Sequence, residues 1–217
     1  LLVLSAGDAD QVCRDVLAGL QNSITYEGKP SNSTGISHNP GNPIDQDLLV
    51  EQFGSRLQQN VLLSGLTTAR VGGPARYYVV ANNADELGRD VSFLWSHDIP
   101  VFILGTGANV LLSDSGFDGV VVHNRAKGIV IDWIDDQPRL TAESGANLGT
   151  VARQAALNGL TGLEWASTVP GSLGGAVYGN AGAHGGNMQQ SLVLANILHR
   201  EKGYLSLSSV QMAYTYR

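Results

Sequence analysis

The glycines of this chain are bunched rather than spread, and this placement limits what the chain can fold into. The sequence has 27 glycines in 217 residues, and between Gly159 and Gly186 they recur without the three-residue period of collagen or the serine and proline bias of a linker. Apolar residues such as Leu173 and Val177 lie between them. Because glycine permits positive φ and close backbone approach, the stretch indicates backbone shaped around a ligand.

Composition and charge narrow the class of protein. A chain with 43% hydrophobic and 15% charged residues is ordinary for a globular protein, and its length suffices for one or two domains with real cores. The net charge of −6 and the pI near 5.2 leave no basic face for a phosphate backbone, so nucleic acid is not an expected partner.

The cysteine content and the first residues bear on where the protein works. The single Cys13 excludes an intrachain disulfide, and no apolar run approaches the ~20 residues that span a bilayer, so we expect a cytoplasmic protein without membrane contact. The chain begins with Leu1 and has no basic segment before its first apolar run, which argues against a signal peptide. We expect a piece of a longer gene product.

Two segments precede the main body of the sequence. Residues 1–21 predict a strand, an acidic turn and a helix, which could be the end of one α/β domain. Residues 22–44 include SNSTGISHNPGN, a stretch with almost no aliphatic content that is typical of a linker. A domain boundary is expected there.

The remaining sequence predicts an α+β fold with two mixed β regions and helices outside them. Apolar spacing predicts helices over residues 45–59, 84–97 and 148–157, the second beginning with a capping box of Asn83 and Glu86. A hairpin that turns at Lys202 and Gly203 is expected near the end. Short β-like runs are expected at residues 76–80, 101–104, 110–112, 117–124, 129–134 and 139–145.

The first candidate site is the segment LGTGANVLLSD, in which Gly105, Gly107 and Asn109 follow a buried strand. Glycine lets consecutive N–H groups point inward, where they can hold a pyrophosphate. A tight turn between two strands is the alternative. A Rossmann dinucleotide motif is disfavoured, because Val110 stands where its third glycine is required.

The second candidate site is TVPGSLGGAVYGNAGAHGG, residues 168–186. Pro170 fixes one φ angle and the glycines remove side chains, so the loop can be rigid and close to a flat ligand. The Asn180 amide could meet the polar edge of a flavin ring. The alternative is a glycine-rich structural crossing between domains.

A third block, VGGPARYY at residues 71–78, follows Thr67, Thr68 and Arg70. Proline and paired glycines are common in turns, so a turn into an edge strand is as good an interpretation as a ligand contact.

In this order the blocks resemble the family of UDP-N-acetylenolpyruvoylglucosamine reductases (UDP-N-acetylmuramate dehydrogenases). The resemblance covers residues 62–217 and rests on T-T-x-R-V-G-G-P-A, G-x-G-x-N-V-L-L-S-D, G-L-x-G-L-E, V-P-G-S-L-G-G-A-V, N-A-G-A-x-G and Y-x-Y-R. It implies a two-part FAD-binding fold of the vanillyl-alcohol-oxidase type, with subdomains at 45–125 and 126–217, the second incomplete, and the C-terminal substrate domain missing.

The resemblance also implies noncovalent FAD, held by two segments that we name the first glycine loop (residues 105–110) and the second glycine loop (residues 169–182). No metal site is expected. The implied cofactor-binding residues are Gly105, Thr106, Gly107, Ala108, Asn109 and Val110 in the first loop, and Val169, Pro170, Gly171, Ser172, Gly174, Gly175, Asn180 and Gly182 in the second.

The implied reaction uses NADPH to reduce FAD, after which hydride passes to the enolpyruvyl double bond of a UDP-sugar substrate. An Arg, a Glu and a proton-donating Ser serve this chemistry in the family, and only the Arg matches a residue here, Arg217. The Ser and Glu are expected beyond residue 217. On that ground residues 1–217 alone are expected to lack turnover.

The match has departures and one further resemblance. Thr106 and Ala108 replace the usual residues of the first glycine loop, and His184 stands where Tyr is common and is expected to be a pocket-wall residue. Residues 1–21 resemble the C-terminal end of UDP-N-acetylmuramate:L-alanine ligase, which implies a fusion of two pathway enzymes joined at the linker.

Two other functions stay open. The chain could belong to another sugar or alcohol oxidase of the same flavin superfamily with covalently attached FAD, although Cys13 lies outside the match and no His lies in the first glycine loop. It could also be a noncatalytic flavin-binding fragment.

Overall fold

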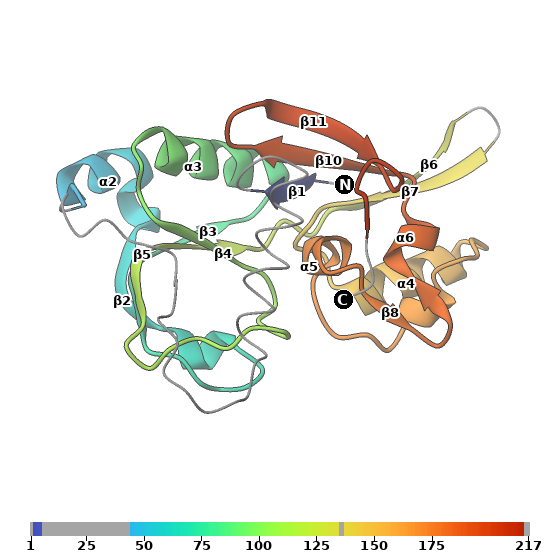
Figure 1. Cartoon of the computed structure of the whole chain (residues 1–217), viewed down its shortest axis with the longest axis horizontal. Coiled ribbons are helices and arrows are strands. Elements are labelled where there is room, and N and C mark those ends of the chain that lie inside the picture. The colour runs from blue at the N-terminus through green and yellow to red at the C-terminus, as the bar shows by residue number, and fades with distance from the viewer. Residues whose placement is uncertain (1, 6–43, 135–136, 215–217) are drawn as a thin grey trace.

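A computed structural model describes residues 2–5, 44–134 and 137–214, which form two packed halves (Figure 1). The helix expected within residues 1–21 and nearly all of the expected linker lie outside these ranges. The first half holds strands β2 to β5 and helices α2 and α3, and the second half holds the remaining elements.

The first half is built on a four-stranded sheet of order β2-β3-β5-β4. Its strands β3, β5 and β4 are parallel, whereas β2 is antiparallel to β3. The carboxyl ends of the parallel strands therefore meet at one edge of the sheet. The strands are β2 (Gln58–Leu62), β3 (Pro74–Ala81), β4 (Val101–Leu104) and β5 (Phe117–Asn124).

Helices α2 (Gln46–Phe53) and α3 (Ala84–Ser96) cover one face of this sheet (Figure 1). The apolar stripe of α3, with Leu87, Val91 and Leu94 fully buried, packs against strand residues such as Val79. The Asn83 side chain caps α3 by accepting from the Glu86 N–H. The predicted capping box is only half formed, because the Glu86 carboxylate accepts from the Asn82 N–H instead.

The opposite face of the sheet carries a second apolar cluster. Leu63, Leu104 and Val121 are fully buried there. Val110 and Leu112 of the segment that follows β4 pack onto this cluster. The chain after β4 therefore folds back over the face of the sheet that α3 does not cover.

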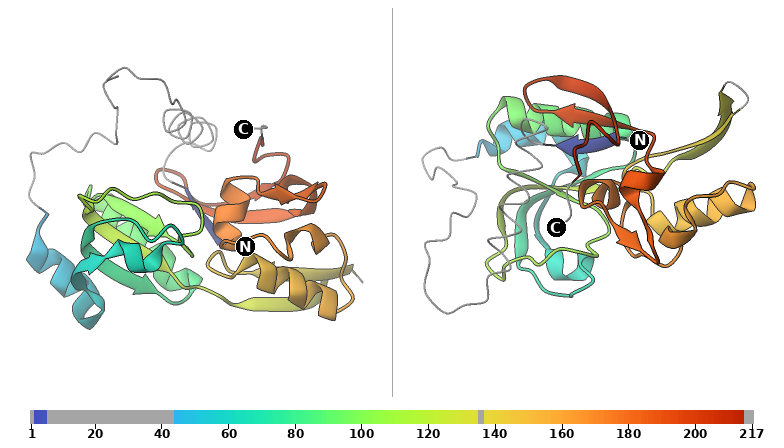
Figure 2. Two further views of the ribbon diagram at one scale, coloured as in Figure 1. Left: turned by 90° about the horizontal axis from the view of Figure 1, so that it is seen from below. Right: turned by 45° about the vertical axis from the view of Figure 1, so that its right-hand side comes forward.

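The second half has its own core around helix α4 (Leu148–Leu157) and α5 (Leu173–Tyr178). A two-stranded hairpin of β6 (Ile129–Ile134) and β7 (Gln137–Ala142) leads into it (Figure 2). The remaining short elements are a 3-10 turn (Glu164–Ala166), β8 (Gly182–Ala183), β9 (Gly186–Asn187) and α6 (Met188–Ser191).

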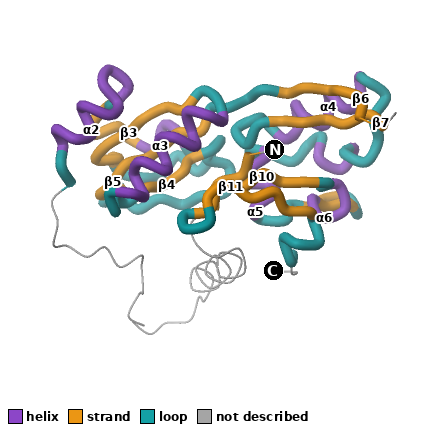
Figure 3. Tube along the Cα trace, turned by 90° about the horizontal axis from the view of Figure 1, so that it is seen from above, coloured by secondary structure: helices purple, strands orange, loops and turns teal. Residues whose placement is uncertain are grey.

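Strand β10 (Leu194–His199) joins the two halves. It pairs with β11 (Gly203–Ser208) in an antiparallel hairpin and with β1 (Leu2–Ser5) in parallel. Ala195 and Ile197 belong to the core of the second half, whereas Leu198 belongs to the cluster beneath α3. The view from above shows the hairpin running from the side of α3 to the side of α6 (Figure 3).

Most of the predicted elements are present. Helices α3 and α4, the runs that became β3 to β7, and the hairpin turn before Gly203 are confirmed. The expected helix over 45–59 is wrong at its end, because Gly54 adopts a φ of 52° and stops α2 at Phe53. Residues 110–112 form no strand but a loop, in which Val110 and Leu112 pack onto the sheet face and Leu111 is exposed. Strand β3 is not an edge strand but lies between β2 and β5.

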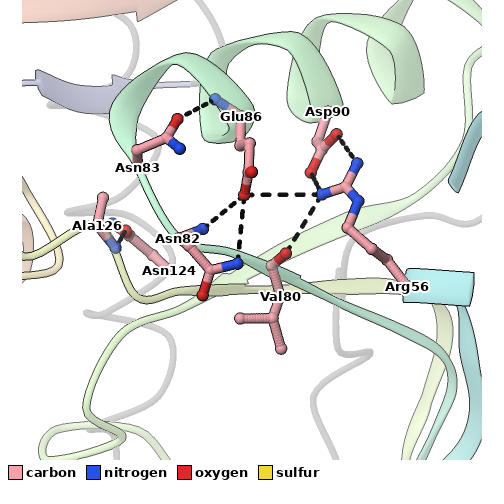
Figure 4. Close-up of polar contacts among 8 residues, drawn as sticks. All are labelled: Arg56, Val80, Asn82, Asn83, Glu86, Asp90, Asn124 and Ala126. Carbon is pink, nitrogen blue, oxygen red and sulfur yellow. Dashed lines mark hydrogen bonds and ion pairs between the residues drawn. The ribbon is translucent and has the colours of Figure 1, made fainter.

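A buried ion pair fastens the end of α2 to α3 (Figure 4). The Arg56 guanidinium donates to both carboxylate oxygens of Asp90 at 2.8 Å and to the Val80 carbonyl at 3.3 Å. The Asp90 side chain is only 2% exposed. The hydrogen bond with Asp90 raises the pKa of Arg56, so the guanidinium stays charged.

We expect Arg56→Met to lower the free energy of unfolding by about 3 kcal/mol, because it leaves the Asp90 charge buried without its partner. Urea denaturation followed by circular dichroism measures this change. Arg76→Met is the control, since the Arg76–Asp118 pair is exposed and worth less than ~1 kcal/mol. Equal losses in the two variants would contradict the assignment.

Candidate functional site

The first glycine loop follows β4 at the carboxyl edge of the sheet. Gly107 has a φ of 67°, which favours glycine, and a Cβ placed on it would lie 2.8 Å from Thr67 Cα. Its carbonyl accepts from the Thr68 N–H at 2.9 Å. The loop therefore needs glycine here for backbone conformation and for close packing.

The N–H groups of this loop are not used by the rest of the described chain. Within the described ranges, none of the backbone N–H groups of residues 105–109 donates to a protein acceptor. A run of unused N–H groups in a glycine turn is a feature of anion-binding loops. The arrangement therefore suits a phosphate better than it suits a purely structural turn.

The second glycine loop is shaped by Gly171, Ser172 and Gly174. Gly171 has a φ of 134°, and the buried Ser172 side chain caps α5 by accepting from the Gly175 N–H. The Gly174 N–H donates to the Ser144 carbonyl at 2.7 Å, and a Cβ on Gly174 would lie 2.9 Å from Ser144 Cβ. The start of this loop is thus pressed against residue 144.

The two glycine loops meet. A Cβ placed on Gly105 would lie 2.5 Å from Ser172 Oγ and 3.1 Å from Ser172 Cβ. A Cβ here would displace the Ser172 hydroxyl and crowd its Cβ, so glycine at 105 lets the two loops approach closely. Residues 67 positions apart in sequence therefore border one site.

The third sequence block supports the first glycine loop from outside. Besides the Thr68 contact, the Thr67 hydroxyl donates to the Val71 carbonyl at 3.0 Å, and the Gly73 N–H donates to the Ser113 carbonyl at 2.8 Å. The Thr68 and Gly73 bonds hold residues 67–73 against the first glycine loop and the segment after it, and the Thr67 bond closes the turn itself. The turn interpretation of this block accounts for these contacts.

Not every expected site residue lies at this junction. Asn180, with a φ of 43°, uses its side-chain oxygen to accept from the Gln189 N–H at 2.9 Å. Gly182 packs on Gly186 and Asn187 of the β8–β9 hairpin, and Val169 packs on the core of the second half. These contacts give the three residues structural roles and leave the Asn180 side-chain N–H₂ for a ligand.

The remaining residues expected at the site differ in exposure and in place. Thr106 and Asn109 are exposed, Ala108 is half-buried and Pro170 is exposed. His184 lines an open cavity of about 550 Å³ with Trp165 and Gln190, which fits the expected pocket-wall role. Arg217 lies outside the described residues.

Sequence reasoning missed residues 144–147, the first two of which it assigned to the end of a β-like run. Ser144 and Ala146 carbonyls accept from Gly174 and Leu173, and Asn147 forms a bridge with Ser172. The sequence signal that could have revealed them is a run of small residues between a strand and a helix that Asn147 caps.

A hydrogen-bonded pair on the uncovered sheet face was also missed. The Tyr78 hydroxyl and His123 Nδ1 are 2.6 Å apart, and His123 is the register partner of Leu104, the residue before the first glycine loop. Burial, with help from Arg125 and Lys127, lowers the pKa of His123 to about 4. Burial raises the pKa of Tyr78, so both groups are neutral at pH 7.

Two structural features are absent from the described part of the chain. Among residues 44–134 and 137–214, no group of three His, Cys, Asp or Glu side chains is arranged to hold a metal ion. None of the helices in the same ranges is long and apolar enough to cross a membrane.

Comparison with known proteins agrees with this geometry. The FAD binding domain family matches residues 75–200, more than half of the chain, so this chain belongs to that family. Within it, the chain is a homologue of the UDP-N-acetylenolpyruvoylglucosamine reductases. It is 41% identical over 169 residues to the reductase of Synechococcus sp. (strain JA-3-3Ab) and 35% identical over 178 residues to that of Lachnoclostridium phytofermentans.

The chain spans little more than half of these relatives, 53% of the first and 57% of the second, while the matches cover 77% and 81% of this chain. The solved reductase of Thermus caldophilus matches with a TM-score of 0.59 and 29% identity, over 75% of this chain and 56% of the other. An alkyldihydroxyacetonephosphate synthase matches at 0.58 and 16% identity, covering 89% and 42%, which bears on the fold alone. The predicted α+β FAD-binding fold of the vanillyl-alcohol-oxidase type is confirmed.

Acidification from pH 6.5 towards pH 4 should favour the unfolded chain through His123, because the unfolded imidazole takes up a proton near 6.5 and the folded one only near 4. We expect His123→Leu to lose less stability than the parent between pH 7 and pH 5 in urea denaturation. Tyr78→Phe should lose as much stability as the parent over this pH range, because burial is the main cause of the lowered pKa of His123. An unchanged pH dependence in His123→Leu would refute this role of the imidazole.

Proposed function

We propose that this chain binds FAD noncovalently, with the diphosphate at the first glycine loop and the second glycine loop closing the site beside it. The observation that carries the proposal is the contact of Gly105 with Ser172, which joins the two loops at the unused N–H groups of residues 105–109. Thr106, Gly107, Ala108, Asn109 and Val110 form the phosphate side. Pro170, Gly171, Ser172, Gly174 and Gly175 form the other wall.

The chemistry of the ligand supports this assignment. A pyrophosphate carries two negative charges and needs several donors, which a chain with only 13 Lys and Arg must supply largely from backbone N–H groups. Arg125 and Lys127 lie near enough to His123 to lower its pKa, so positive charge is present at this edge of the sheet. The residues of the site therefore fit the diphosphate of a dinucleotide.

The whole protein, in our proposal, is an NADPH-dependent reductase of a UDP-N-acetylglucosamine enolpyruvate in peptidoglycan synthesis. This rests on the homologous reductases, which the chain covers only in part. FAD would supply hydride transfer, and the residues of this chain would bind and orient it. Arg217 would place a positive charge beside the substrate carboxylate. Cytoplasmic location belongs to the same proposal.

The domain division and the fusion stay predictions. Strand β1 pairs with β10 of the second half, although residues 1–21 resemble the end of a ligase. We propose domain boundaries at residues 21, 44 and 125, and a covalent link to a pathway ligase before the first of them.

We expect the purified chain to take up FAD and release it on acid precipitation. Gly105→Ala should weaken FAD binding about tenfold or more, equal to about 1.4 kcal/mol, because its methyl group forces the loops apart. Quenching of flavin fluorescence on titration measures the affinity. Gly65→Ala is the matched control, since a Cβ there meets nothing within 4 Å. Protein that takes up no FAD would refute the proposal, and flavin retained after acid would point to a covalent oxidase.

For the whole protein we expect NADPH to bleach the flavin absorption without oxygen, and the enolpyruvyl UDP sugar to restore it. In the first half-reaction the flavin would receive hydride from NADPH, and in the second it would pass hydride to the UDP sugar. Stopped-flow absorbance at the flavin maximum records both steps. Bleaching that the UDP sugar fails to reverse would contradict the reductase assignment but leave FAD binding intact.

A further inference from the structure

One carboxylate connects three segments of the chain. Glu143 Oε1 accepts from the Ala84 N–H, the first residue of α3, at 2.8 Å. Its Oε2 accepts from the Gly128 N–H at 2.6 Å, and the Glu143 N–H donates back to the Gly128 carbonyl at 2.8 Å. Glu143 follows β7, so a side chain of the second half is bonded to the helix of the first half.

The residues after Glu143 hold the second glycine loop by backbone hydrogen bonds alone. Ser144 and Ala146 carbonyls accept from the N–H groups of Gly174 and Leu173 at 2.7 and 2.8 Å. The Leu148 N–H donates to the Gly171 carbonyl at 3.0 Å. Residues 144–148 and 171–174 therefore move together.

A second bond ties the same segment to the first half. The Asn124 side chain, at the end of β5, donates to the Ser144 hydroxyl at 2.8 Å, and both side chains are buried. Of the two side chains by which this segment is bonded to the first half, Glu143 and Ser144, Glu143 is the charged one. Its carboxylate lies at the N-terminus of the 13-residue helix α3, which is the positive end of the helix dipole. The first glycine loop is fixed to β4 of this same sheet.

We infer that Glu143 is a positioning residue for the dinucleotide. By fixing residues 144–148 to α3, it sets the separation between the second glycine loop and the first, where Gly105 meets Ser172. The inference rests on the proposed binding of FAD at this junction. Glu143 itself need not touch the ligand, because its effect passes through the Gly174 and Leu173 hydrogen bonds.

The test is Glu143→Gln, which keeps the size of the side chain and removes its charge and one of its two acceptor oxygens. We expect about tenfold weaker FAD binding, measured by fluorescence titration. We also expect faster hydrogen exchange at the N–H groups of Leu173 and Gly174 in the ligand-free chain. Glu164→Gln is the matched control, because the Glu164 carboxylate accepts from the Gly162 N–H two residues away, at 2.8 Å, and so makes a local bond rather than a link between distant segments.

The two readouts separate the inference from the proposed function. If the parent chain binds no FAD, the proposed function fails, and local exchange at Leu173 and Gly174 still decides whether Glu143 fixes the loop. Parental affinity and parental exchange in Glu143→Gln would overturn the inference, as would an equal loss in Glu164→Gln. Should Glu143→Gln not fold, Ser144→Ala removes the other anchor and is expected to show the same local exchange and weaker binding.

Discussion

The contact between Gly105 and Ser172 is the constraint on which the rest of the site depends. It exists because residue 105 has no side chain, so that two loops from different halves approach until a Cβ on residue 105 would lie 2.5 Å from Ser172 Oγ. Neighbouring contacts support this close approach: Gly107 packs on residues 66–68, and Gly174 packs on Ser144. Close approach accounts for glycine at 105, 107 and 174, whereas Gly171 has open space around it and is accounted for by its φ of 134°.

The fold supplies this contact by placing loops at the carboxyl edge of a parallel sheet and covering only one sheet face with helices. Helix α3 packs against one face of the sheet, and its Asp90 is bonded to Arg56. The other face receives the chain that leaves β4, and it carries the neutral Tyr78–His123 pair beside the first glycine loop. Donors without charge thus predominate where a diphosphate would be bound, with Arg125 and Lys127 farther along.

Local patterns predicted the elements, and long-range geometry could not be predicted from them. The stripe of α3 and the β-branched run of β5 are visible in sequence because each depends on near neighbours. Residues 110–112 misled because Val110 and Leu112 can place their side chains on one face either as a strand or as a loop against a sheet. The roles of Glu143 and His123 depend on strand register and on which loops meet, which composition does not encode.

Strand β10 gives alternate side chains to both cores, Ile197 to one and Leu198 to the other. Two halves that share a strand cannot separate about a hinge without breaking the packing of that strand in one of the two cores. The halves should then unfold in a single cooperative step, and a nucleotide must enter and leave by local rearrangement of the loops while the frame stays closed.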